Sequence, residues 1–110
     1  MTTPEGRVKD AAKKVLRERG CYFYMPVQTG MGVVGIPDLV CCVPVHITSD
    51  MVGCTIGVFV GAEAKAPGKV NDTTANQDYQ IAAIQDAAGV ALAFDDARQL
   101  ELMLSLLQGD

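Results

Sequence analysis

The sequence predicts an α/β fold, in which a mixed β-sheet is flanked by helices in the order α-β-β-β-α-β-α. Three observations favour it: an N-terminal segment with apolar residues at helical spacing, a long alternating strand over Thr55–Ala66, and a fully apolar strand, Val90–Phe94, which a second helical segment separates from it. A chain of 110 residues has room for one hydrophobic core. We therefore expect a single small domain over residues 1–110.

The first helix is predicted to begin with Thr3 as its N-cap and Pro4 at its first position, and to end before Gly20. An apolar stripe at helical spacing runs along this segment, and we expect it to be buried. Its members are Val8, Ala11, Ala12, Val15 and Leu16. Glu5 lies at the margin of the stripe, one turn before Val8, so its carboxylate is expected to point inward.

Two strands are predicted after this helix. Residues 21–28 are rich in aromatic side chains and form the first, and residues 38–43 form the second, with Pro44 at an edge of the sheet or outside it. The connection over residues 46–53 is too short for a crossover helix. We therefore expect the second strand to pair antiparallel with Thr55–Ala66.

The strand Thr55–Ala66 has two different faces. Its even positions are all apolar and are expected to face the core, so Glu63 and Lys65 point together away from the core. Two glycines share the face of the charged pair. Because glycine has no side chain, this face suits a surface that a large ligand approaches closely. The predicted antiparallel pairing would place Asp38 beside Glu63, which gives this surface the features of a functional site.

A loop over residues 67–72 leads to a helix that Thr73 or Thr74 caps and that ends at Ala88, with Gly89 in the C′ position. One face of this helix is expected to be buried against the sheet, with its first member beside Lys65. The members of this face are Gln77, Ile81, Ile84 and Ala88. Because the helix joins Thr55–Ala66 to Val90–Phe94, we expect these two strands to be parallel.

The last helix begins at Asp95 or Asp96 as its cap and leaves hardly a polar face. Its apolar residues are Leu100, Leu102, Met103, Leu104, Leu106 and Leu107. A helix that is apolar almost all round is expected to be covered. The sequence therefore predicts a homodimer in which this C-terminal helix packs against a second copy of the chain.

A net charge of −4 and a pI near 4.8 argue against a protein that coats nucleic acid generally, but the charge is unevenly distributed. Six of the nine basic residues lie between Glu5 and Arg19, so this end of the chain has the charge to face phosphates. The alternative is an ordinary solvated helix face. The residues that we expect to contact DNA are Lys9, Lys13, Lys14, Arg17 and Lys69.

The four cysteines, Cys21, Cys41, Cys42 and Cys54, form no C-x-x-C pair and lie in apolar surroundings. Buried reduced thiols are the preferred interpretation, ahead of disulfides or a zinc site. The sequence also contains neither a run of 18 apolar residues nor the layout of a signal peptide at its beginning. We therefore expect a cytosolic protein without a membrane partner.

Three segments together carry a resemblance to a known family. Gly35-Ile36-Pro37-Asp38 places an acid after a proline, Glu63-Ala64-Lys65 follows roughly twenty-five residues later, and Gln77 opens a helix. This pattern resembles the PD-(D/E)XK nucleases, and within them the stand-alone VRR-NUC proteins of phages and bacteria, over nearly the whole chain. The resemblance implies a restriction-endonuclease-like fold and a location in the cytosol of a bacterium or a phage-infected host.

The resemblance also implies roles for individual residues. Asp38, Glu63 and the backbone carbonyl of Ala64 would bind Mg²⁺ or Mn²⁺, hard ions that prefer oxygen ligands. Lys65 would orient or deprotonate the attacking water, and Gln77 would steady the lysine or the phosphate. The family uses a further glutamate from its first helix as a ligand, for which Glu5 is the first candidate and Glu18 the second.

The resemblance implies a metal-dependent, structure-specific DNA endonuclease, with the four-way (Holliday) junction as its substrate, because a twofold dimer suits a twofold substrate. Two alternatives stay open: a junction-binding or assembly protein without chemistry, and a flap or duplex nuclease of the same fold. The carboxylates also have a purely structural interpretation. Two like charges about 4 Å apart repel by about 4 kcal/mol at an effective dielectric near 20, and Lys65 alone could offset this in a salt bridge.

Overall fold

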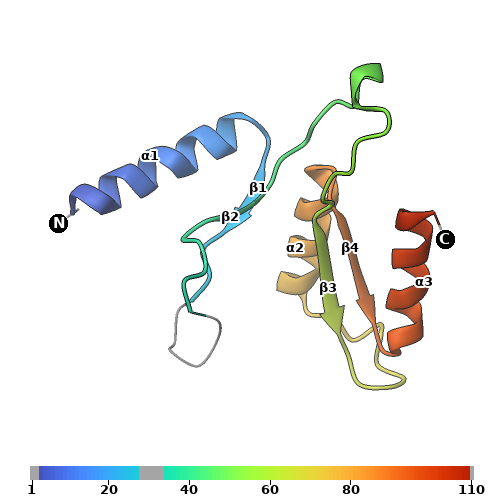
Figure 1. Ribbon diagram of the computed structural model, residues 1–110. Coiled ribbons are helices and arrows are strands. Elements are labelled where there is room, and N and C mark those ends of the chain that lie inside the picture. Colours follow the sequence, from blue (N-terminus) through green and yellow to red (C-terminus); the bar gives the residue numbers. More distant parts are fainter. Residues whose placement is uncertain (1–2, 28–33, 110) are drawn as a thin grey trace. The chain divides into compact units, whose positions relative to one another are not determined.

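The computed structural model describes residues 3–27 and 34–109 (Figure 1). Contacts divide the chain into two compact units, Met1–Thr55 and Ile56–Asp110, and each is described by itself. The described residues form three α-helices, one short 3₁₀ helix and two small sheets of two strands each. The α/β class predicted from the sequence is confirmed. The predicted single mixed sheet is not observed in the described residues, because β2 (Val40–Cys42) pairs with β1 (Tyr22–Tyr24) and not with the strand predicted over Thr55–Ala66.

In the N-terminal unit, α1 spans Pro4–Glu18 and begins as predicted, because the Thr3 hydroxyl accepts a hydrogen bond from the Gly6 N–H at 2.9 Å. Strand β1 (Tyr22–Tyr24) pairs antiparallel with β2 (Val40–Cys42). Both strands are shorter than the predicted segments 21–28 and 38–43, and Gln28 lies outside the described residues. The connection predicted over residues 46–53 contains the 3₁₀ helix η1 (Ser49–Met51).

The apolar stripe of α1 is largely uncovered within its own unit, which contradicts the expected burial. Val8 is 70% exposed and Val15 is 48% exposed, and no residue of α1 is buried. Ala12 and Leu16 are half-buried, and the Arg17 guanidinium of this helix lies 5.3 Å from the centre of the Phe23 ring.

In the C-terminal unit, β3 (Val60–Ala64) pairs parallel with β4 (Val90–Phe94), as the sequence predicted, and Val60 lies opposite Val90. The strand predicted over Thr55–Ala66 is shorter in the structure, because residues 55–59 form no strand. Helix α2 (Ala75–Asp86) connects the two strands, and α3 (Ala97–Gln108) follows β4. The two helices lie on opposite sides of this small sheet (Figure 1).

The two faces of β3 are arranged differently from the prediction. Glu63 and Lys65 do share a face, but α2 covers it: a Cβ atom added to Gly61, on the same face, would lie 2.7 Å from Ile84 Cδ1. Gly61 therefore makes room for a helix side chain rather than for a ligand. The opposite face, with Ala62 and Ala64, is the more exposed one.

Helix α2 ends at Asp86, two residues before the predicted end at Ala88. Ala88 has φ +68°, and the Ala88 N–H donates to the Gln85 carbonyl while the Gly89 N–H donates to the Ile84 carbonyl, at 3.0 and 2.9 Å. This pattern is a Schellman motif in which C′ is Ala88, not Gly89. Ala87 takes the predicted place of Ala88 in the buried face of the helix, with 3% of its surface exposed.

Helix α3 is capped by Asp96, whose side chain accepts from the Arg98 N–H, and Gly109 follows it with φ +78°. Leu100 and Met103 are half-buried, whereas Leu102 is 64% and Leu106 is 74% exposed. The apolar outer face that the sequence predicted is therefore present and uncovered within this unit. What covers it stays a prediction.

The four cysteines differ in their burial. Cys42 is buried, with 5% of its surface exposed, and burial raises the pKa of its thiol, with a smaller effect from Cys21. Cys54 is exposed, so the prediction of burial is wrong for this residue, which follows η1 in a loop. Of the helices in residues 3–27 and 34–109, none combines the length and apolar character that a membrane crossing requires.

Candidate active site

Glu63, Lys65 and Gln77 form one hydrogen-bonded cluster in the C-terminal unit. Lys65 Nζ donates to Gln77 Oε1 at 2.7 Å, and Gln77 Nε2 donates to Glu63 Oε1 at 2.6 Å. Glu63 and Lys65 lie two residues apart on one face of β3, and Gln77 reaches them from the first turn of α2. The side-chain amide thus contacts both the acid and the amine.

The helix cap fixes the orientation of the Gln77 amide. Thr74 is the N-cap of α2, and its hydroxyl accepts from the Gln77 backbone N–H at 3.1 Å. In return, Gln77 Oε1 accepts from the Thr74 N–H at 2.9 Å, which completes a capping box. Because Oε1 serves both Thr74 and Lys65, the amide nitrogen is left to face Glu63.

The backbone carbonyl of Ala64 points to the edge of β3 that faces away from β4. Phe59 accepts from the Val90 N–H and Lys65 donates to the Phe94 carbonyl, at 3.0 and 2.8 Å, so the odd residues of this strand bond to β4. Backbone groups alternate in direction along a strand, which turns the Ala64 carbonyl the other way. The oxygen predicted as a metal ligand is therefore not used by the β3–β4 ladder.

In the N-terminal unit, Lys9 joins the other two carboxylates that the sequence singled out. Its Nζ lies 3.7 Å from Glu5 Oε1 and 3.8 Å from Asp38 Oδ2. The Glu5 side chain is 75% exposed and that of Asp38 is 55% exposed, so the expected inward direction of Glu5 is wrong within this unit. Both acids nevertheless gather around one cation, although they lie more than thirty residues apart in the sequence.

The other predicted DNA contacts lie in different surroundings. Lys13 pairs with Asp10 at 3.9 Å, and Lys14 is exposed. Arg17 stacks on an aromatic ring, as described above, so part of the basic face of α1 is engaged by its own unit. Lys69 is 64% exposed in the loop after β3 and pairs with Asp72 at 3.9 Å. Glu18, the second candidate for the first-helix ligand, is exposed at the end of α1.

The predicted site residues thus form two clusters, Glu63–Gln77–Lys65 and Glu5–Lys9–Asp38, one in each unit. Within the part of the chain that the structure describes, no three His, Cys, Asp or Glu side chains gather closely enough to hold a metal ion. Sequence reasoning missed two contributors, Lys9 as the partner of both acids and Thr74 as the group that fixes Gln77. The i, i+4 spacing of Glu5 and Lys9 and the capping-box pattern T-x-x-Q were available signals for them.

Comparison with protein families, curated proteins and solved structures adds no relative to this picture. No family model matches the chain, and no curated protein or solved structure does.

Proposed function

We propose that the protein is a metal-dependent, structure-specific DNA endonuclease that hydrolyses phosphodiester bonds and resolves four-way junctions as a dimer. One observation supports it above the others: Glu63 and Lys65 share a face of β3 and are both held by Gln77. An ammonium beside a carboxylate that can hold a metal ion suits phosphodiester hydrolysis, because the two cations would offset the negative charge that develops on the entering and leaving oxygens.

The donor set suits Mg²⁺ or Mn²⁺, because all of its members are oxygens. The proposed ligands are the carboxylates of Glu5, Asp38 and Glu63 and the backbone carbonyl of Ala64. When bound, such an ion supplies a polarised water and neutralises phosphate charge. Lys9, which already lies beside Glu5 and Asp38, offsets the repulsion between these carboxylates.

The residues around the ion have their own tasks. A lysine ammonium has three N–H groups, and Gln77 uses one of those of Lys65, which leaves two for a water molecule or a phosphate oxygen. By bonding to both groups, Gln77 would keep the Lys65 ammonium from forming a direct salt bridge with Glu63, which leaves the carboxylate available to the metal ion. The purely structural interpretation, a salt bridge between Glu63 and Lys65, is disfavoured because both charged groups bond to the Gln77 amide.

The four-way junction and the dimer are proposed together. Leu102 and Leu106 lie one turn apart on the exposed side of α3 and offer an apolar surface for a second copy of the chain. A twofold dimer presents two sites in the symmetry of a four-way junction.

The test is cleavage of a synthetic four-way junction in Mg²⁺ or Mn²⁺, with the duplex and a flap of the same sequence as competing substrates. Asp38→Ala and Lys65→Ala are each expected to lower the cleavage rate at least 100-fold, in line with the loss of a catalytic group. Asp50→Ala is the matched control, because this exposed acid belongs to the same unit as Asp38 and to neither cluster. Full activity in both variants would contradict the assignment.

The same assay separates the alternatives. A junction-binding protein without chemistry would bind in EDTA and give no metal-dependent product. A flap or duplex nuclease would cleave those substrates in preference to the junction.

A further inference from the structure

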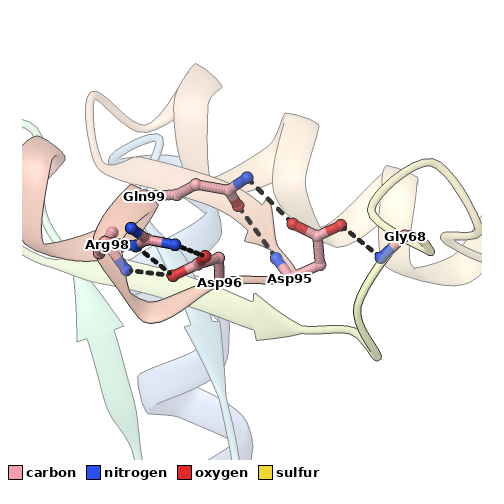
Figure 2. Close-up of polar contacts among 5 residues, drawn as sticks. All are labelled: Gly68, Asp95, Asp96, Arg98 and Gln99. Atoms are coloured by element: carbon pink, nitrogen blue, oxygen red, sulfur yellow. Dashed lines mark hydrogen bonds and ion pairs between the residues drawn. The ribbon is translucent and has the colours of Figure 1, made fainter.

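Asp95 directly follows β4, and its carboxylate holds the loop between β3 and α2. Asp95 Oδ2 accepts from the Gly68 backbone N–H at 2.9 Å, and Oδ1 accepts from Gln99 Nε2 at 3.0 Å (Figure 2). Gln99 Oε1 in turn accepts from the Asp95 N–H at 3.0 Å. Both carboxylate oxygens are therefore used, and they join this loop to the first turn of α3.

The loop consists of two successive turns. The Lys69 N–H donates to the Ala66 carbonyl and the Asp72 N–H donates to the Lys69 carbonyl, each at 2.9 Å. Gly68 has φ +81°, a backbone conformation that residues other than glycine rarely adopt. The bond to Asp95 links these turns to the strand end and so sets where they lie.

This loop carries Lys69, which lies close to the candidate site in the sequence. Lys69 comes four residues after Lys65, and its side chain is 64% exposed. The Phe94 carbonyl, next to Asp95, accepts from the Lys65 N–H at 2.8 Å. One end of β4 therefore fixes both the backbone of Lys65 and the loop of Lys69.

We propose that Asp95 is a positioning residue for DNA binding: it holds the loop so that Lys69 contacts a phosphate of the strand that is cut. This inference rests on the proposed function and deepens it, because it makes Asp95 responsible for the position of Lys69 on the DNA. Asp95 touches neither the reacting atoms nor the DNA. It acts through Gly68 and the turn that follows.

The sign of the effect distinguishes positioning from simple charge. Asp95→Asn removes a negative charge, and electrostatics alone would strengthen DNA binding. Asparagine, however, has one side-chain oxygen for two donors, Gly68 N–H and Gln99 Nε2, so one bond is lost. Positioning therefore predicts weaker binding. Asp96→Asn is the matched control, because it removes the same charge at the next residue, which bonds to Arg98 and not to the loop.

The experiment measures junction binding by fluorescence anisotropy in EDTA between 50 and 200 mM salt. Lys69→Ala is expected to weaken binding roughly three- to tenfold and to reduce the slope of log affinity against log salt by about 0.9, the value for one phosphate contact. Asp95→Asn should weaken binding roughly two- to fivefold in the wild-type background. It should add nothing in the Lys69→Ala background, because its effect passes through Lys69.

Two further measurements make each outcome decisive. Amide exchange at Gly68 should become faster in Asp95→Asn, and in Mg²⁺ the KM for junction cleavage should rise while kcat is kept. The positioning role would be overturned if Asp95→Asn lowered junction affinity equally with and without Lys69, or if Asp95→Asn bound the junction as tightly as Asp96→Asn does. In either case, cleavage by the wild type would still support the proposed function. A wild-type protein that neither binds nor cleaves the junction would overturn both.

Discussion

Gln77 Oε1 lies 2.7 Å from Lys65 Nζ and accepts a hydrogen bond from it. The same oxygen accepts from the N-cap of α2, so a capping interaction and a contact of the candidate site depend on one atom. A helix cap is a local, sequence-encoded feature, whereas the Lys65 contact joins a strand to a helix. Placing both on one amide ties the geometry of the candidate site to the beginning of α2.

Replacing Gln77 by methionine is therefore expected to affect both stability and activity. Methionine has a similar length and helix propensity but neither donates nor strongly accepts a hydrogen bond, so the side-chain bonds to the Thr74 N–H, Lys65 and Glu63 are lost. We expect the free energy of unfolding to fall by about 1–2 kcal/mol in urea denaturation. Under the proposed function, cleavage should fall by about 10- to 100-fold, as for other outer-shell partners. Asn76→Ala, at the exposed neighbouring residue, should leave the free energy of unfolding and the cleavage rate unchanged within experimental error.

The sequence specified the local features of the chain well and the packing of its faces less well. Thr3, Thr74 and Asp96 cap the helices where turn chemistry predicted caps, and the parallel pairing of β3 with β4 followed from the helix between them. Alternation along β3 showed that its two faces differ. It did not show which face α2 covers, because a sheet with helices on both sides has two covered faces.

The candidate site shows the same division. Lys65 and Gln77 meet as predicted, because both lie on regular elements with a known periodicity. The role of Lys9 was missed, since its contact with Asp38 depends on how α1 lies against the end of β2. Whether Asp38 and Glu63 bind one ion stays a prediction.

Gly61→Ala tests the packing of α2 on β3. The new Cβ would lie 2.7 Å from Ile84 Cδ1, so the isoleucine must move, at a cost of about 1 kcal/mol in the free energy of unfolding. Ile84→Val removes this methyl group and alone costs about 1 kcal/mol. The double variant should lose clearly less than the two single losses together. Strict additivity in urea denaturation would show that the two residues do not touch.

Ala88→Gly is expected to stabilise the protein by about 1 kcal/mol. Ala88 has φ +68°, where an alanine Cβ is strained and glycine is not. The same change at Ala82, which is exposed inside α2, should destabilise by about 1 kcal/mol through helix propensity. Opposite signs in thermal unfolding support the left-handed cap. A loss of stability in both variants would contradict it.

The stability of the protein should depend on the ionisation of Asp96 in acid. Hydrogen bonds from the Arg98 side chain and then from its backbone N–H hold the pKa of Asp96 below its usual 3.8. A folded pKa below the unfolded one stabilises the protein above the unfolded value, and this contribution disappears as the pH falls through the folded pKa. Between pH 5 and pH 2, Asp96→Asn should therefore lose less stability than the wild type. Parallel pH profiles would contradict the role of Arg98.

Leu106→Glu tests the proposed dimer. Leu106 is 74% exposed, so a charge there should cost little in the folding of one chain but would be desolvated in an interface formed by α3. We expect light scattering to give about twice the chain mass for the wild type and one chain mass for the variant. Gln108→Glu adds the same charge at the exposed end of the same helix and should remain dimeric. A monomeric wild type would refute the proposed dimer. A Leu106→Glu variant that remains dimeric would show that α3 does not form the interface.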